Sequence, residues 1–426
     1  MRHSLHNSPS ITHLRGDPWS ACLGWQQAGS ALLLVDFAFT PWWLEGAAEQ
    51  QLTAIYYREA DQLCVAVTDQ SLQAAGLAPA EQYQSWLQQH SLFSAEIGAA
   101  LPLAPVLIPK PWGQEIWFTG VEERGICHFG GKGASTPIPW LQAALPADYG
   151  GEGPLVLLKI LDPDAAEVTG DLYFELHQEK REVYVVTHVD PSAWPDGNGY
   201  IRYGFDPGKL EQVGDDQAFR RQYLQAVRAY ETVRREIDEG REAVSTALLE
   251  QECTLRAGMD SFTHMRPLKV GDVVVVPLLM PHSLQHGVRT IEFQTPVYER
   301  KILSFAQKVL TQEHWDTAEA IGQMRLLPPE QTPFEILQQE KGVLVERVVD
   351  FPDFEVRRIR IEAGSQMQLA LAESYGLVMM VEGTLGVDGQ DFDPEQAFLL
   401  PRTRQLTLAP SQPARPLVLL LALPRS

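Results

Sequence analysis

The chain has 426 residues and a formal net charge of −21. This length leaves room for two to four domains, and the acidic balance argues against DNA or RNA partners, which bind basic faces. Its four cysteines are scattered without pairs, which is typical of a reducing compartment, and the longest apolar runs are too short to span a bilayer. We therefore expect a soluble, cytoplasmic protein that does not associate with membranes.

The first part of the chain, residues 1–105, shows no pattern that indicates chemistry. Apolar runs over 31–39 and 52–67 predict strands, and 81–90 predicts an amphipathic helix. We expect a small N-terminal α/β region that caps the rest of the protein.

Two short stretches follow. The segment 108–117 reads IPKPWGQEIW, in which two prolines impose an extended backbone before a Trp-Gly turn and a strand. The segment 154–162 reads PLVLLKILD, an apolar run that carries one lysine, Lys159.

The chain is organised around residues 175–186, ELHQEKREVYVV. Alternate side chains of a strand share a face, so Glu175 and His177 project together. Glu182 follows at the start of a β-rich run, as expected if a tight turn brings the chain back beside the first strand.

Residues 207–262 have a different character. Apolar residues recur every three or four positions from Phe219 to Ile237, which predicts an amphipathic helix that is capped by Asp215 or Asp216 and ends at Gly240. A second helix is expected from Arg241 to about Leu255.

The next β-rich stretch ends at a second histidine. Residues 271–282 read GDVVVVPLLMPH, a valine run followed by a turn that presents His282. Two carboxylates and two imidazoles from three strands make a four-ligand site for a divalent metal: Glu175, His177, Glu182 and His282. The alternative is a polar surface strand and an unrelated histidine in a turn.

These spacings resemble the paired signature of the cupin barrels, and the order of the stretches resembles the type I mannose-6-phosphate isomerases, a cupin family with one metal. The resemblance rests on IPKPWG, PLVLLKILD, ELH, KRE and the PH run with its following arginine, and it covers about residues 106–426. Glu175 stands where many cupins have histidine and the isomerases have glutamine, and Leu279 stands where glycine is usual.

The resemblance implies a mainly β protein with a helical insertion. We expect an N-terminal α/β region over 1–105, a metal-binding cupin (jelly-roll) barrel over 106–330 with its insertion at about 207–262, and a second, metal-less cupin-like domain over 331–426. Ala370, Ala372 and Gly376 occupy the ligand positions of that second domain.

It further implies an aldose–ketose isomerase of a hexose phosphate, with one divalent metal per chain. Zinc is expected, with iron, manganese and nickel left open, and the chain would be a monomer or homodimer. The basic residues of the family's active site correspond to Lys159, Lys180 and Arg300. Each also has an interpretation without a catalytic role: Lys159 as a lysine at the end of a strand, Lys180 as a solvated turn residue and Arg300 as part of a surface ion pair.

Glu292 is a candidate base if it faces the barrel interior. Lys159 fits proton transfer if burial near a cation lowers its pKa. Four residues replace the family's long acidic insert between its histidine and glutamate ligands, and Lys159 stands sixteen residues before Glu175, farther than usual, so the sugar need not be mannose 6-phosphate. A cupin oxygenase with iron at the same ligands and a non-catalytic sugar-binding cupin remain alternatives.

Overall fold

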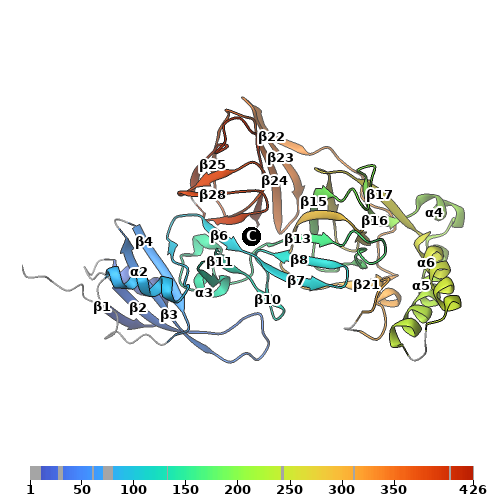
Figure 1. The fold of residues 1–426 in the computed structure, drawn as a ribbon, viewed down its shortest axis with the longest axis horizontal. Coiled ribbons are helices and arrows are strands. Elements are labelled where there is room, and N and C mark those ends of the chain that lie inside the picture. The colour runs from blue at the N-terminus through green and yellow to red at the C-terminus, as the bar shows by residue number, and fades with distance from the viewer. Residues whose placement is uncertain are drawn as a thin grey trace, which may run out of the picture. The chain divides into compact units, whose positions relative to one another are not determined.

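A computed structural model describes residues 11–26, 32–59, 62–70, 80–131, 133–240, 244–309, 312–402 and 404–425. The protein is mainly β, with one group of long helices (Figure 1). It divides into two compact units. Unit 1 comprises residues 1–106, 117–157 and 334–426, and unit 2 comprises residues 107–116 and 158–333. None of the described helices is both long and apolar enough to cross a membrane.

The N-terminal part of unit 1 is a five-stranded sheet in the order β1-β2-β3-β4-β5. Helix α2 contributes Leu87 to a core on this sheet that also includes Leu34 and Ile55, so the small α/β region is present. The expected strand pair over 31–39 and 52–67 forms, although residues 31, 60 and 61 lie outside the described residues. The elements are β1 (Ile11–Arg15), α1 (Pro18–Trp25), β2 (Leu32–Phe39), β3 (Gln50–Glu59), β4 (Gln62–Thr68), α2 (Ala80–Gln89) and β5 (Ala95–Glu96).

The rest of unit 1 is built on a nine-stranded sheet in the order β12-β11-β6-β29-β26-β31-β24-β23-β22. Its middle joins segments far apart in sequence, because Leu101 on β6 pairs with Leu399 on β29. The strands are β6 (Leu101–Ala104), β11 (His128–Gly130), β12 (Ser135–Pro137), β22 (Glu335–Glu340), β23 (Val343–Asp350), β24 (Phe354–Ile361), β26 (Gly376–Glu382), β29 (Ala397–Leu400) and β31 (Leu417–Pro424).

Short elements complete unit 1: β9 (Val121–Glu122), β10 (Gly125–Ile126), α3 (Ile138–Gln142), η2 (Ala147–Tyr149), β25 (Met367–Ala370), β27 (Leu385–Val387), β28 (Gln390–Phe392) and β30 (Gln405–Leu408). A β-rich C-terminal region is present as expected. The division into three domains at residues 105 and 330 stays a prediction.

Unit 2 contains two open sheets that share one hydrophobic core. The six-stranded sheet has the order β18-β15-β20-β13-β8-β7, and the five-stranded sheet has the order β17-β16-β19-β14-β21. Tyr184 and Val276 from the first sheet and Ile201 and Leu284 from the second lie in the same cluster. Because the sheets remain hydrogen-bonded separately, the jelly-roll is a two-sheet sandwich and not a closed barrel.

The strands of the first sheet are β7 (Val106–Lys110), β8 (Gly113–Trp117), β13 (Leu157–Pro163), β15 (Glu182–Val189), β18 (Val273–Val276) and β20 (Val288–Gln294). Those of the second are β14 (Phe174–Leu176), β16 (Gly199–Phe205), β17 (Thr263–Leu268), β19 (His282–Leu284) and β21 (Lys301–Ser304). A short helix, α7 (Thr317–Ala320), follows β21.

The helical insertion is present in unit 2 as α4 (Pro207–Val213), α5 (Asp216–Glu239) and α6 (Thr246–Asp260), with α5 and α6 packed side by side (Figure 1). Asp215 caps α5 by accepting from the backbone N–H of Ala218, and Gly240 ends the helix at a positive φ of 58°. The predicted start of the second helix at residue 241 falls outside the described residues, which omit 241–243. Helix α6 begins at Thr246 because the Ser245 hydroxyl caps it.

Candidate metal centre

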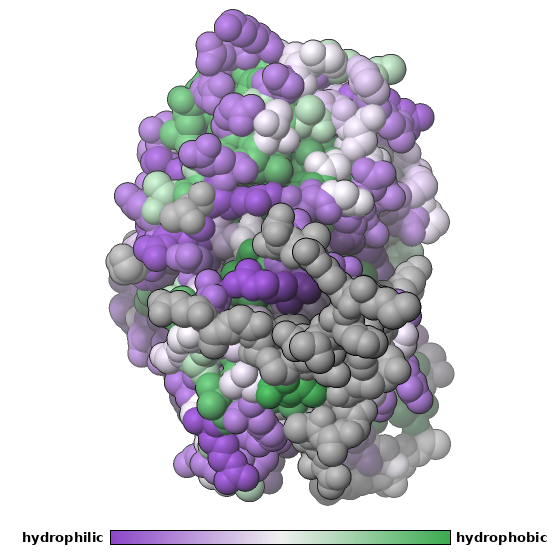
Figure 2. Space-filling view, turned by 90° about the vertical axis from the view of Figure 1, so that its left-hand side faces the viewer, coloured by the Kyte–Doolittle hydropathy of each residue, from purple (hydrophilic) through white to green (hydrophobic). Residues whose placement is uncertain are grey.

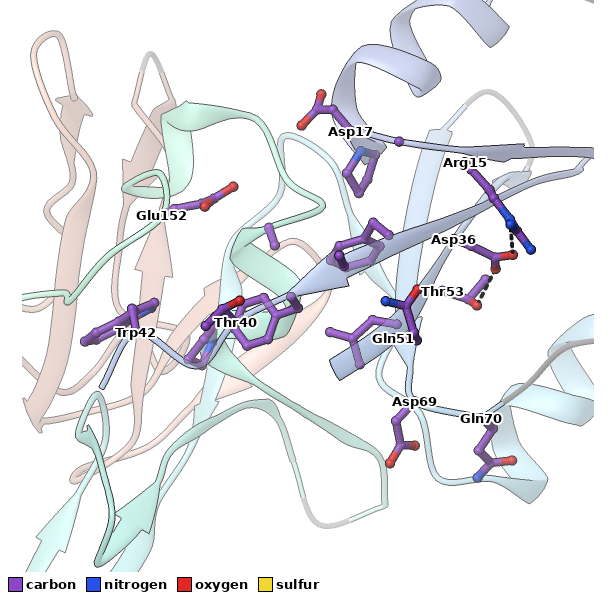
Figure 3. Close-up of a pocket in the computed structure, with 18 of the residues that line it drawn as sticks. Arg15, Asp17, Asp36, Thr40, Trp42, Gln51, Thr53, Asp69, Gln70 and Glu152 are labelled. Atoms are coloured by element: carbon purple, nitrogen blue, oxygen red, sulfur yellow. Dashed lines mark hydrogen bonds and ion pairs between the residues drawn. The ribbon is translucent and has the colours of Figure 1, made fainter. Parts of the chain in front are cut away.

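A cavity of about 970 Å³ lies in unit 1. The buried residues Phe37 and Leu52 line part of it, whereas Asp17, Asp69 and Glu152 lie apart from one another around it (Figure 3). In the space-filling view of Figure 2, hydrophilic and hydrophobic residues are interspersed over the face that is turned to the viewer. Because Asp17, Asp69 and Glu152 lie apart, these carboxylates do not converge on one point as metal ligands or as an acid–base pair.

A convergent group lies in unit 2. Among the residues that the structure describes, the one group of three acidic or histidine side chains close enough to share an ion is Glu175, His177 and His282, whose ligand atoms lie within 4.8 Å of one another. Strand pairing causes this proximity, because Glu175 on β14 lies directly opposite His282 on β19. His177 follows β14 immediately, so the sequence spacing and the sheet register bring the three together.

Both imidazole rings are buried and oriented by backbone carbonyl groups. His177 Nδ1 lies 3.0 Å from the carbonyl oxygen of Glu299, and His282 Nδ1 lies 2.9 Å from that of Met280. Because a carbonyl only accepts hydrogen bonds, each ring carries a proton on Nδ1, and Nε2 is the nitrogen that would bind a metal once it is deprotonated. His177 Nε2 and Glu175 Oε2 are buried without a hydrogen-bond partner.

Glu182, the fourth residue of the predicted ligand set, opens β15 and contacts both imidazoles. Its carboxylate oxygens lie 3.2 Å from His177 Nε2 and 3.1 Å from His282 Nε2. It also bonds the ammonium of Lys180 at 2.9 Å and accepts the hydroxyl of Tyr184 at 2.6 Å. Burial alone would raise the pKa of Glu182, but the charge of Lys180 and the two histidines outweigh it, so the pKa is lowered and the carboxylate stays ionised.

This donor set fits a divalent metal. Two imidazole nitrogens and one or two carboxylates are the ligands that zinc and its neighbours in the first transition row prefer. The unpartnered atoms are costly when buried, and a bound cation would satisfy them. The role of Glu182 as a fourth ligand stays a prediction.

Four neighbouring strands of the six-stranded sheet each contribute one charged side chain beside this group. Across the order β20-β13-β8-β7 these are Glu292, Lys159, Glu115 and Lys110. The Lys159 ammonium lies 3.2 Å from Glu292 Oε2 and 3.8 Å from Glu115 Oε2, and the Lys110 ammonium lies 3.2 Å from Glu115 Oε1. The four side chains form a buried row of alternating charge.

Glu292 meets the condition set for a base, because it is buried and pairs in register with Tyr184, whose ring lies in the shared core. Burial raises the pKa of Glu292 well above its usual range, although Lys159 opposes the change. Proton transfer by Lys159 is conditional on a lowered pKa. Burial does lower it, but the charges of Glu115 and Glu292 outweigh burial and raise the pKa. Lys159 is therefore held as a cation.

The remaining basic residue, Arg300, is about a third exposed at its side chain. Its guanidinium stacks over the ring of Tyr173 at 4.4 Å, and its Nε lies 3.9 Å from Glu175 Oε2. His286 does not join the cluster. Its Nδ1 lies 2.7 Å from Asp171 Oδ1, and its ring stacks on Trp194.

Sequence reasoning missed Lys110, Glu115 and Tyr184. Tyr184 could have been found, since strand alternation places it on the same face as Glu182. The lysine and glutamate of the IPKPWGQEIW segment gave no such signal, because their proximity to Lys159 depends on which strands are neighbours in the sheet.

Solved structures share this architecture. The mannose 6-phosphate isomerase from Bacillus subtilis is 16% identical and has a TM-score of 0.53 over 76% of this chain and 99% of its own. A zinc-bound mannose 6-phosphate isomerase is 12% identical, with a TM-score of 0.54 over 77% and 100% of the two chains. A lysine-to-alanine variant of the phosphomannose isomerase from Salmonella typhimurium is 11% identical, with a TM-score of 0.55 over the same shares.

The fold is that of the mannose 6-phosphate isomerases. The mainly β cupin class with a helical insertion, predicted from the sequence motifs, is confirmed. No family model and no curated protein sequence matches the chain. The likeness therefore rests on the fold, and the function has to be argued from the site.

Proposed function

We propose that this protein is a metal-dependent aldose–ketose isomerase of a hexose phosphate, with mannose 6-phosphate and fructose 6-phosphate as the first substrates to test. The single observation that carries the proposal is the buried Glu292–Lys159 pair beside a metal-ligand set. An isomerase needs a group that moves a proton between C1 and C2 and a positive environment for the enediolate. The isomerase fold and the zinc in one of its relatives support the choice.

Glu175, His177 and His282 would hold the metal, with Glu182 as the fourth ligand. A bound divalent ion supplies Lewis-acid polarisation of sugar oxygens. Zinc is the proposed ion because two imidazoles and carboxylates suit it and because a relative of this fold contains it.

Glu292 takes the proton from C2 and returns it to C1, while the proton of the C2 hydroxyl passes to the oxygen on C1. Its buried position suits this role, because a raised pKa brings the carboxyl closer to the acidity that proton exchange near neutral pH requires. Lys159 stabilises the enediolate charge as a fixed cation and does not act as a base.

Lys180 anchors Glu182 through its ion pair, so it orients a ligand. Arg300 is the group that best suits the sugar phosphate. Its side chain is partly exposed and its guanidinium lies over the ring of Tyr173, which leaves hydrogen-bond donors for two phosphate oxygens.

The proposal is tested with metal-loaded protein and mannose 6-phosphate in an assay that couples fructose 6-phosphate to a chromogenic reaction. We expect turnover that a chelator abolishes and zinc restores. A protein with stoichiometric metal that converts no hexose phosphate in a substrate screen would disprove the proposal.

One observation favours a second candidate. Two histidines and one carboxylate, the group Glu175, His177 and His282, are also the ligands of non-haem iron oxygenases. Oxygen consumption that depends on Fe(II) would favour this reading. An oxygenase has no general need for Lys159 and Glu292, however, so the isomerase remains the better proposal.

A further inference from the structure

In the row of alternating charge, Lys159 has two carboxylate partners, although one would neutralise its ammonium. Glu292 on β20 and Glu115 on β8 lie on strands on either side of β13, which carries Lys159. Glu115 is 7% exposed, and Lys110 on β7 neutralises its second oxygen at 3.2 Å. Burial of a carboxylate costs free energy unless it is paired and oriented. The row is formally neutral, with two lysines and two glutamates.

Glu115 changes where the Lys159 ammonium can lie. With Glu292 as its only partner, a flexible lysine would collapse onto both oxygens of that carboxylate and occupy the base. With Glu115 at 3.8 Å and Glu292 at 3.2 Å, the ammonium is shared between two carboxylates. Both oxygens of Glu292 are buried without a hydrogen-bond partner, but the ion pair with Lys159 is made through Oε2, which leaves Oε1 for a carbon-bound proton.

We propose that Glu115 is a positioning residue that draws the Lys159 ammonium away from Glu292 and so keeps one oxygen of Glu292 open for proton transfer. Lys110 has the complementary task of neutralising Glu115. The inference rests on the proposed isomerase function for its kinetic consequence. The geometry that carries it lies entirely within unit 2 and among described residues.

The charged groups around Lys159 come from three other strands. Glu115 and Glu292 lie within 4 Å of its ammonium, and Glu182 on β15 acts on it over a longer distance. Glu292 is already the nearer of the two carboxylates, and removal of the Glu115 charge leaves it as the one carboxylate within 4 Å of the ammonium among the described residues. The ammonium should then move toward Glu292, and catalysis should slow with little change in substrate binding.

The test is a double-mutant cycle of Glu115→Gln and Lys159→Met, measured in the metal-loaded enzyme as kcat and KM. We expect Glu115→Gln alone to lower kcat by about 10- to 100-fold with KM within about threefold. In the Lys159→Met background the same change should alter kcat by less than about threefold, because Glu115 acts through Lys159. Equal losses in both backgrounds, or no loss in the first, would overturn the proposal.

Glu355→Gln is the matched control. Glu355 is a buried carboxylate of unit 1 that pairs with arginines, including Arg357 and Arg425. Its loss should affect the melting temperature and leave kcat unchanged. A fall in kcat for Glu355→Gln equal to that for Glu115→Gln would show a general effect of buried charge removal and would overturn the assignment.

A second readout does not need activity. The ¹H–¹⁵N signal of the Lys159 ammonium, identified by its absence in Lys159→Met, should be sharp in the unaltered protein and shifted or broadened in Glu115→Gln. If the unaltered protein isomerises no hexose phosphate, the proposed function fails while this signal still decides the positioning role. An ammonium signal that Glu115→Gln leaves unchanged would overturn that role by itself.

Discussion

Two buried histidines four residues apart allow a direct test of the metal centre. His282 and His286 are 2% and 7% exposed, respectively. His282 turns its Nε2 toward the ligand group, whereas His286 bonds Asp171 and stacks on Trp194. We therefore expect His282→Ala to abolish stabilisation by zinc and His286→Ala to preserve it.

The magnitude follows from the unsatisfied atoms. Each buried acceptor without a partner costs about 1–3 kcal/mol, so satisfying His177 Nε2 and Glu175 Oε2 would contribute about 2–6 kcal/mol. A ligand present at 100 times its dissociation constant stabilises by about 2.7 kcal/mol, which lies in this range. For a domain of about 150–250 residues, the size range of unit 2, a stabilisation of about 2.7 kcal/mol corresponds to a rise in Tm of about 5–10 °C.

The assay is thermal unfolding of chelator-treated protein, with and without zinc, beside metal content by elemental analysis. His286→Ala should unfold about 1–3 kcal/mol more easily because its bond to Asp171 and its stacking are lost, yet it should keep the full zinc-dependent rise. A zinc-dependent rise that survives in His282→Ala, or that vanishes in His286→Ala, would refute the assignment of the ligands.

Three further substitutions separate the roles within the protein. Glu292→Gln should lower kcat by about 10²- to 10⁴-fold while KM and zinc content stay nearly unchanged, measured in the coupled assay; normal turnover would exclude Glu292 as the base. Arg300→Ala should raise KM for a phosphorylated sugar by about tenfold or more, whereas Arg300→Lys should recover part of the loss; an unchanged KM for both would remove Arg300 from phosphate binding. Tyr230→Phe removes a buried hydrogen bond of 2.9 Å to Glu252 between α5 and α6. It should cost about 1 kcal/mol in urea unfolding and leave kcat unchanged.

The sequence predicts the elements better than their partners. The heptad-like spacing from Phe219 to Val233 identifies α5 because a helix that buries one face must repeat its apolar residues every three or four positions. The cap at Asp215 and the glycine at 240 are local signals of the same kind. The start of α6 at Thr246 is harder to predict because the capping hydroxyl of Ser245 stands inside a polar run in which several residues could begin a helix.

The metal ligands were accessible from sequence for a related reason. Glu175 and His177 lie on one face by strand alternation, and the turn before β19 presents His282. What the sequence does not contain is the register that places Glu175 opposite His282, since pairing between strands a hundred residues apart depends on the whole sheet. Resemblance to a family supplied that register in advance.

The pKa of Lys159 is harder to predict from sequence than the metal ligands are. From sequence, a buried lysine beside a metal site has an expected pKa that falls, because only desolvation and the ion can be foreseen. The sign reverses in the structure because β13 lies between β20 and β8, each with a glutamate on the side that faces Lys159. A strand order that exchanged β8 for an uncharged neighbour would leave the same lysine with one carboxylate. The protonation state of Lys159, and with it the division of labour between cation and base, is thus a property of sheet order and not of the residue or its local sequence.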